Sequence, residues 1–178
     1  MALTCTPGGP ADNSYVTLAQ ANSYFADTLR GAQWTDHSET LREQALIQAT
    51  AEIEALGGPR AAQDNATRPL FSGAPYDPDG QALHFPRTVD VDDDGDLYVP
   101  ESIRVAVIEQ AVWLLDQQTN PDILDREELQ AQGVRSIGIE GHSETYDPTS
   151  KPYGVCVKAW QSMNMYVSSA RAGRTRAR

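Results

Sequence analysis

A run of acidic residues between positions 90 and 101 has the residue types and the spacing of a calcium-binding loop. Asp90, Asp92 and Asp94 occupy positions one, three and five of such a loop, Gly95 occupies position six and Glu101 occupies position twelve. Carboxylate oxygens are the ligands that calcium prefers, and a glycine at the sixth position allows a sharp turn. The carboxylates that could bind the ion are those of Asp90, Asp92, Asp94, Asp96 and Glu101.

The residues around this loop argue against calcium. A helix should lead into such a loop, whereas Phe85-Pro86-Arg87 precedes this one, and Pro100 falls just before the twelfth position. The alternative is a solvated turn rich in aspartate, ordered by Arg87 or by Arg104. We therefore favour no metal here, and calcium binding stays open as the alternative.

Other residues with catalytic potential are scattered along the chain. His37, His84 and His142 do not fall at a metal-ligand spacing, and no nucleophile elbow, phosphate loop or dinucleotide glycine motif occurs. Cys5 and Cys156 are far apart, which argues against a disulfide framework or a cysteine zinc site and favours a reducing compartment. We expect no enzymatic activity and no cofactor.

The longest apolar segment without a helix breaker, residues 99–116, predicts the central helix of the core. Ile103, Val107 and Ala111 recur at helical spacing. Pro100 suits the first turn, where no backbone N–H is lost, and Pro121 provides the stop.

Two earlier helices are predicted by their start and stop signals. Thr17 and Gln20 form a capping box for a first helix that should run to about Leu29 and end at Gly31. A second helix should follow from residues 35–38 and end at the Gly57-Gly58-Pro59 segment.

The remaining segments predict a loop, a hairpin and a last helix. A short helix is expected at residues 122–132. Two alternating runs, 134–139 and 142–146, flank a Glu140-Gly141 turn and predict a β-hairpin, which is marginal in water without a partner. Pro152 should open the final helix.

We therefore expect a mainly α fold: a small helical bundle with long loops, one β-hairpin and a C-terminal helix with a tail. Its parts are an N-terminal arm (1–14), a helical body (15–132) that contains a long loop (57–100), the hairpin (133–148), and the C-terminal helix and basic tail (149–178).

Charge is divided unevenly along the chain, whose net charge is −11. All 25 acidic residues lie in residues 1–150 beside eight basic ones, which leaves −17, whereas residues 151–178 carry six basic residues and no acid. A body this acidic repels nucleic acid, and a basic segment attached to it suits an acidic partner. No apolar run reaches the length of about 18 residues that spans a membrane, so no membrane partner is expected.

Three motifs, in their order along the chain, resemble those of a family of structural proteins. They are the Tyr15–Phe25 segment with its capping box, residues 43–50 in the second helix, and Leu83-His84-Phe85-Pro86-Arg87 followed by an acidic glycine turn and the central helix. Together they cover residues 15–116. This set is similar to tailed-bacteriophage head–tail adaptors, also called head-completion or connector proteins, some members of which carry the label DnaT-like single-stranded DNA-binding protein.

The resemblance implies a virion protein at the head–tail interface, found in the host cytoplasm during assembly. Subunits of this kind would form a homo-oligomeric ring, expected to be a dodecamer, between the portal protein and a tail or stopper protein. DNA would pass through the ring without specific binding. The basic last segment would dock on the portal through Trp160, Tyr166, Arg171, Arg174, Arg176 and Arg178. Contacts with neighbouring subunits or the tail would come from Phe85, Arg87, Arg135, Ile137, Ile139 and Tyr146.

The alternative function is single-stranded DNA binding, which the label of some relatives implies. The arginine-rich tail could bind phosphates by charge. Aromatic residues that would stack on bases are sparse beside it, since only Trp160 and Tyr166 lie near, and both suit packing roles.

Overall fold

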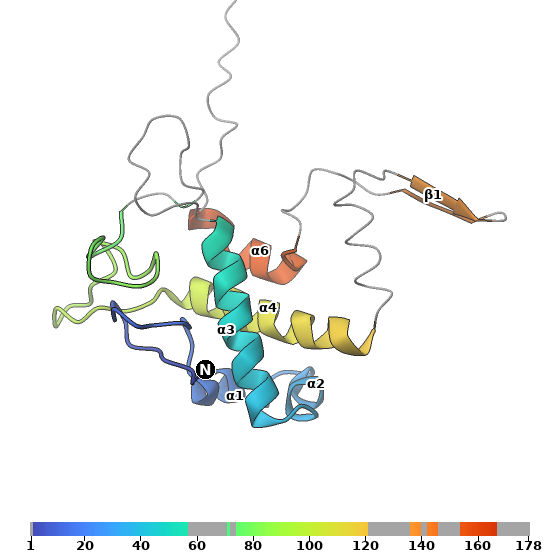
Figure 1. Cartoon of the computed structure of the whole chain (residues 1–178), viewed down its shortest axis with the longest axis horizontal. Coiled ribbons are helices and arrows are strands. Elements are labelled where there is room, and N and C mark those ends of the chain that lie inside the picture. The colour runs from blue at the N-terminus through green and yellow to red at the C-terminus, as the bar shows by residue number, and fades with distance from the viewer. Residues whose placement is uncertain are drawn as a thin grey trace, which may run out of the picture.

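The computed structural model describes residues 2–56, 71, 74–120, 136–139, 142–145 and 154–166, and it confirms a mainly helical fold. Its elements in chain order are α1 (Leu18–Ala26), α2 (Gly31–Thr35), α3 (Glu39–Leu56), α4 (Glu101–Thr119), β1 (Ser136–Ile139), β2 (His142–Thr145), α6 (Val157–Met163) and the 3₁₀ turn η1 (Asn164–Tyr166). Helix α3 crosses α4, and α6 lies beside α4 (Figure 1). No helix in the described part of the chain has the length and apolar character needed to cross a membrane.

The central helix α4 forms the core, as its residue spacing predicts. Its buried side chains face α3 on one side and α6 on another, because apolar residues occur almost all around the helix. The helix begins at Glu101, where the carboxylate faces the positive end of the helix dipole. The members of this core that belong to α4 are Ile103, Ala106, Val107, Ile108, Ala111, Val112 and Leu115.

Helix α1 has the predicted capping box but ends earlier than expected. The Gln20 backbone N–H donates to Thr17 Oγ1 at 3.2 Å, and the Thr17 backbone N–H donates to Gln20 Oε1 at 2.9 Å. The helix stops at Ala26, and Gly31 begins the short α2 rather than ending the first helix. This turn brings the Trp34 ring to 4.9 Å from the Phe25 ring in a stacked arrangement, and it leaves Leu29 fully exposed.

The described part of the 57–100 connection is folded onto the helices. Isolated antiparallel bridges join Pro75 to Arg87 and Val91 to Leu97, and the Phe85–Pro86 peptide bond is cis. The Phe85 ring packs edge-on against the rings of Tyr15 and Phe71. The segment Leu83–Arg87 is therefore an anchor that fastens this connection to the core.

The hairpin is confirmed, and the last helix begins later than predicted. Strands β1 and β2 pair antiparallel with Ile139 opposite His142, while the expected turn at 140–141 lies outside the described residues, as does the expected helix at 122–132. Helix α6 begins at Val157 rather than near Pro152, because Cys156 caps it: the Ala159 backbone N–H donates to Cys156 Sγ at 3.3 Å.

Candidate functional site

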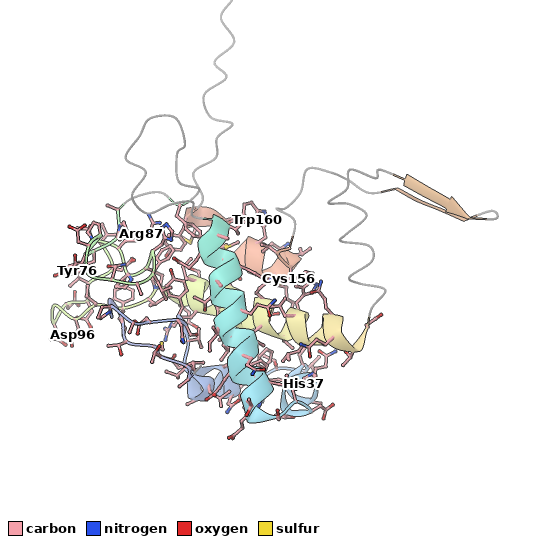
Figure 2. The ribbon with its side chains drawn as sticks, viewed as in Figure 1. His37, Tyr76, Arg87, Asp96, Cys156 and Trp160 are labelled. Carbon is pink, nitrogen blue, oxygen red and sulfur yellow. The ribbon has the colours of Figure 1, made fainter. Side chains whose placement is uncertain are left out.

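The aspartate-rich loop is held by its own backbone. Asp92 Oδ1 accepts hydrogen bonds from the backbone N–H groups of Asp94 (3.0 Å) and Asp96 (2.8 Å), and Gly95 takes the left-handed φ of 91° that the turn requires. Figure 2 shows Asp96 at the outer end of the loop. In the described residues, no three His, Cys, Asp or Glu side chains gather as a metal-ion site.

Asp90 belongs to the protein interior rather than to the exposed loop. Its Oδ2 accepts a hydrogen bond from the Arg87 backbone N–H at 2.8 Å, and burial raises the pKa of its carboxyl group. Glu101, the twelfth residue of the motif, forms an ion pair with Arg104. The loop is thus a turn in which Arg87 contributes its backbone and Arg104 binds the last carboxylate.

Phe85 and Arg87, two of the expected contact residues, are buried within the single chain. Phe85 is 2% exposed and Arg87 is 4% exposed. The Arg87 guanidinium lies 4.5 Å from the centre of the Phe85 ring, and burial lowers the pKa of this group. Within the described residues, Arg87 Nε and Nη1 have no hydrogen-bond partner. An arginine inside an apolar anchor is hard to predict from sequence, because arginine is usually exposed.

A partly buried carboxylate, Glu54, joins this anchor to α3. His84 Nδ1 lies 2.7 Å from Glu54 Oε2, and the Tyr15 hydroxyl hydrogen-bonds to Glu54 Oε1. The Phe85 backbone N–H donates to the Tyr15 hydroxyl oxygen at 3.1 Å. Burial, and next the negative charge of Glu54, raise the pKa of Tyr15. This arrangement positions the loop and exposes no reactive group at the surface.

A second buried carboxylate, Glu109 in the middle of α4, binds three other elements. It forms an ion pair with Arg30 and accepts a hydrogen bond from the Tyr24 hydroxyl at 2.8 Å, and Lys158 Nζ lies 3.5 Å away. Burial, and next the hydrogen bond to Glu109, raise the pKa of Tyr24 to about 12. The contact between Glu109 and Arg30 spans 79 residues of sequence, so no local pattern could have revealed it.

The basic side chains of the described part are all engaged. Arg30 and Lys158 contact Glu109, Arg104 binds Glu101, Arg87 is buried, and Arg42 donates to Asn22 Oδ1 at 2.8 Å. These five cations stand beside 17 acidic side chains in the described residues outside the hairpin. The described surface therefore offers no cluster of free cations for phosphate groups.

The other predicted contact residues are only partly described. Trp160 and Tyr166 are half-buried, and the Tyr166 ring packs edge-on at 5.4 Å from the Phe85 ring, so both contribute to packing. Ile137 and Ile139 lie in β1, where only the backbone is described. Arg135, Tyr146, Arg171, Arg174, Arg176 and Arg178 lie outside the described residues.

Comparison with known proteins places nearly the whole chain in one family. No curated protein and no solved structure matches the chain. A family model whose description reads "Putative DnaT-like ssDNA binding protein" matches residues 1–159, which include every described element up to the first turn of α6. The chain belongs to this DnaT-like family.

Proposed function

We propose that the chain is a structural, non-enzymatic subunit of a phage head–tail adaptor ring that joins the portal to the tail and extends the DNA channel. The observation that carries this proposal is the charge of the folded body, whose described part has 17 acidic side chains and five basic ones that are all buried or bound. The ordered motifs of residues 15–116, which resemble those of adaptors, support the same function.

An acidic body suits the wall of a channel through which DNA slides. A surface of the same sign as the phosphate backbone gives DNA no attractive site to bind, so the polymer is not retained. Side chains of Asp92, Asp93, Asp94 and Asp96 are exposed, and no described cation neutralises them through an ion pair. Passage without specific binding is the property that such a channel needs.

The basic last segment would attach the ring to the portal. Residues 167–178 contain Arg171, Arg174, Arg176 and Arg178 and no acidic residue, so they complement an acidic surface by forked hydrogen bonds. We expect a chain truncated after Val167 to lose portal binding while it keeps the melting temperature of the full chain. Undiminished binding of the truncated chain would contradict this docking role.

The direct test mixes the purified full chain with the portal protein of the same virus and examines the particles by negative-stain electron microscopy. The adaptor function predicts a second ring, coaxial with the portal, and its absence at every protein ratio would refute the proposal. The subunit number follows from the rotational symmetry of the added ring, for which we expect twelve.

Single-stranded DNA binding is the second candidate, because the description of the family names it. In that case the phosphate contacts would come from basic residues outside the described part, since the described cations are engaged: Arg60, Arg68, Arg126, Arg135 and Lys151 within the matched residues, and the four arginines of residues 167–178. Fluorescence anisotropy of a labelled single strand at low salt separates the two functions. Stoichiometric binding that weakens steeply with salt favours the second candidate, whereas no binding by the full chain favours the adaptor.

A further inference from the structure

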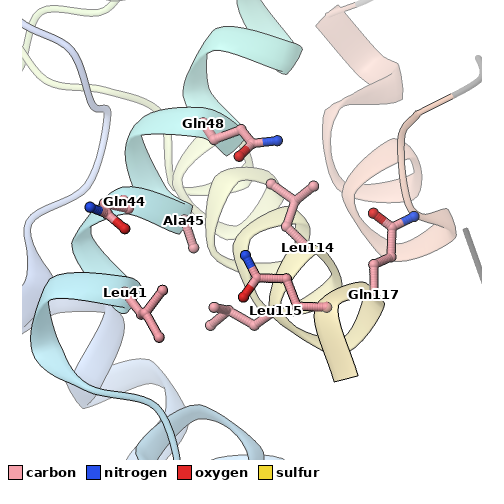
Figure 3. A pocket seen from close by; sticks show the side chains of 8 residues that line it. Leu41, Gln44, Ala45, Gln48, Leu114, Leu115 and Gln117 are labelled. Carbon is pink, nitrogen blue, oxygen red and sulfur yellow. The ribbon is translucent and has the colours of Figure 1, made fainter. Parts of the chain in front are cut away.

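A groove between α3 and α4 lacks charge on a molecule that is otherwise strongly acidic. Its volume is about 240 Å³, and Figure 3 shows it open between the first turns of α3 and the last turns of α4. Leucine and alanine side chains form its floor, and glutamines form its rim. The lining residues are Leu41, Gln44, Ala45, Gln48, Leu114, Leu115, Gln117 and Gln118.

The absence of charge is what makes the groove suitable for a second copy of this chain. Two bodies that are both strongly negative repel each other over most of their surfaces. Contact between copies costs least where neither ionised side chains nor their bound water have to be displaced. None of the eight lining residues is charged, and the groove is smaller than the 300–1,000 Å³ typical of small-molecule sites. A single apolar side chain is the occupant that its size fits.

Leu29 is the side chain that the structure offers for this purpose. It is the most exposed large hydrophobic residue of the described part, at 105%, and it stands on the turn between α1 and α2. Val89 is also exposed, at 80%, but five aspartates follow it within seven residues. Four of these aspartates are exposed, whereas Leu29 has one acidic residue within six positions, Asp27, and the basic Arg30 beside it, so like-charge repulsion disfavours Val89 more than Leu29.

The turn that carries Leu29 and the groove lie on opposite sides of α4. Arg30, the next residue, binds Glu109 and Asp116 of α4. Leu114 of the groove follows Glu109 by five residues, which is about 140° around the helix, and Gln118 follows Asp116 by two residues, about 200°. When a residue protrudes on one side of a subunit and its groove lies on the other side, the contact between copies is head-to-tail. Such contacts close into a ring when the rotation from one copy to the next divides a full turn evenly.

We infer that Leu29 of one copy inserts into the α3–α4 groove of the next copy and that this contact joins neighbouring subunits of the ring. The inference rests on the proposed adaptor function and identifies the surface by which its ring closes. Glutamine amides at the rim can hydrogen-bond to the backbone of the incoming turn, and Leu41 and Leu114 cover the leucine.

The experiment compares self-association of the full chain and its variants, alone and on the portal, by analytical ultracentrifugation and electron microscopy. Leu29→Glu should weaken self-association at least tenfold, because a carboxylate cannot enter the apolar groove without losing its hydration. Val89→Glu is the matched control, since it adds the same charge at another exposed apolar residue, and it should leave association unchanged. Because Leu29 is fully exposed, the melting temperature should not change.

A mixing experiment tests the pairing of the two surfaces. The double variant Gln44→Glu/Gln117→Glu places two carboxylates on the groove rim and should also fail to assemble, although its Leu29 is intact. In a mixture with Leu29→Glu, the double variant supplies an intact Leu29 and Leu29→Glu supplies an intact groove. The mixture should therefore form heterodimers that do not assemble further.

The outcomes separate this inference from the proposed function. Rings of Leu29→Glu as stable as those of the unmodified chain, or no heterodimer in the mixture, would overturn the Leu29 contact and leave the adaptor function standing. Failure of the unmodified chain to form rings, alone or on the portal, would overturn the adaptor function and the contact together.

Discussion

Gln110 accepts a hydrogen bond from the backbone N–H of Cys156 through its Oε1 at 2.8 Å, so a residue buried in α4 fixes the start of α6. The Nε2 of the same amide donates to the Gly154 carbonyl oxygen and to Glu52 Oε2, each at 2.7 Å. One side chain thus holds α3, α4 and the N-terminal end of α6 together.

Replacing Gln110 with leucine should destabilise the fold strongly. The substitution keeps the volume but leaves the Cys156 N–H and the Gly154 carbonyl without their partner, which costs about 3 kcal/mol of unfolding free energy. Urea denaturation measures the loss. Gln161→Leu, at an exposed position of α6, serves as the control and should change stability little. Equal effects of the two substitutions would show that the Gln110 amide is not the link.

The capping box of α1 predicts a smaller effect at its first residue. Thr17→Ala removes the acceptor for the Gln20 backbone N–H and should cost about 1 kcal/mol of unfolding free energy. Thr17→Ser keeps the hydroxyl and should retain most of the stability. Thermal unfolding of the three proteins ranks them, and a serine variant as unstable as the alanine variant would argue that the methyl group matters instead.

Stability should fall at alkaline pH because of the buried phenols. Burial raises the pKa of Tyr24 to about 12, and burial together with Glu54 raises the pKa of Tyr15. The folded protein therefore holds these protons more tightly than the unfolded chain, whose tyrosines have a pKa of about 10. The stabilisation is complete below pH 10 and is lost as the pH rises from there toward 12.

The melting temperature, measured from pH 8 to pH 11.5, tests this prediction. The unmodified chain should show a steeper alkaline decline than Tyr24→Phe, which has no proton to lose at this position. Tyr76→Phe is the control, because the Tyr76 side chain is exposed. Identical slopes for Tyr24→Phe and the unmodified chain would rule out the contribution of Tyr24.

Calcium should not change the stability of the chain. In the described residues no three acidic side chains gather as a metal-ion site, and Asp90, at the first position of the motif, is buried against the Arg87 backbone. Calorimetric titration with calcium should give no heat, and the melting temperature should be the same with calcium and with a chelator. Saturable heat at one ion per chain would restore the calcium-loop interpretation.

Caps and apolar spacing correctly predict the helices in which they occur. They do not predict structure that depends on contacts between residues distant in sequence. The capping box of Thr17 and the apolar spacing of residues 99–116 correctly predict α1 and α4, because caps and spacing act within a few turns. The short α2 was missed because Gly31 is a plausible helix stop. Its course depends on the stacking of Trp34 on Phe25, which sequence spacing does not reveal.

For the candidate contact surfaces too, overall charge could be predicted from the sequence, but the burial of individual side chains could not. Composition and charge predict an acidic body, whereas the contacts of Arg30, Arg87 and Lys158 depend on tertiary structure. The burial of Phe85 and Arg87 could not be predicted from the loop's content of Pro, Gly and Asp, because it depends on an aromatic cluster that packs against the guanidinium. Leu29 was expected at the end of the first helix, and because α1 ends at Ala26, Leu29 lies on the following turn and is exposed to solvent.

The position of Glu109 limits how this subunit can change shape. A ratchet of α4 by one helical turn, about 5.4 Å, would pull the carboxylate away from Arg30 and Tyr24 and strand a charge in the interior. Sliding of α4 against α1, against the turn that precedes α2 and against α6 is therefore disfavoured. A partner that binds this subunit therefore meets α4 in the register that Glu109 fixes.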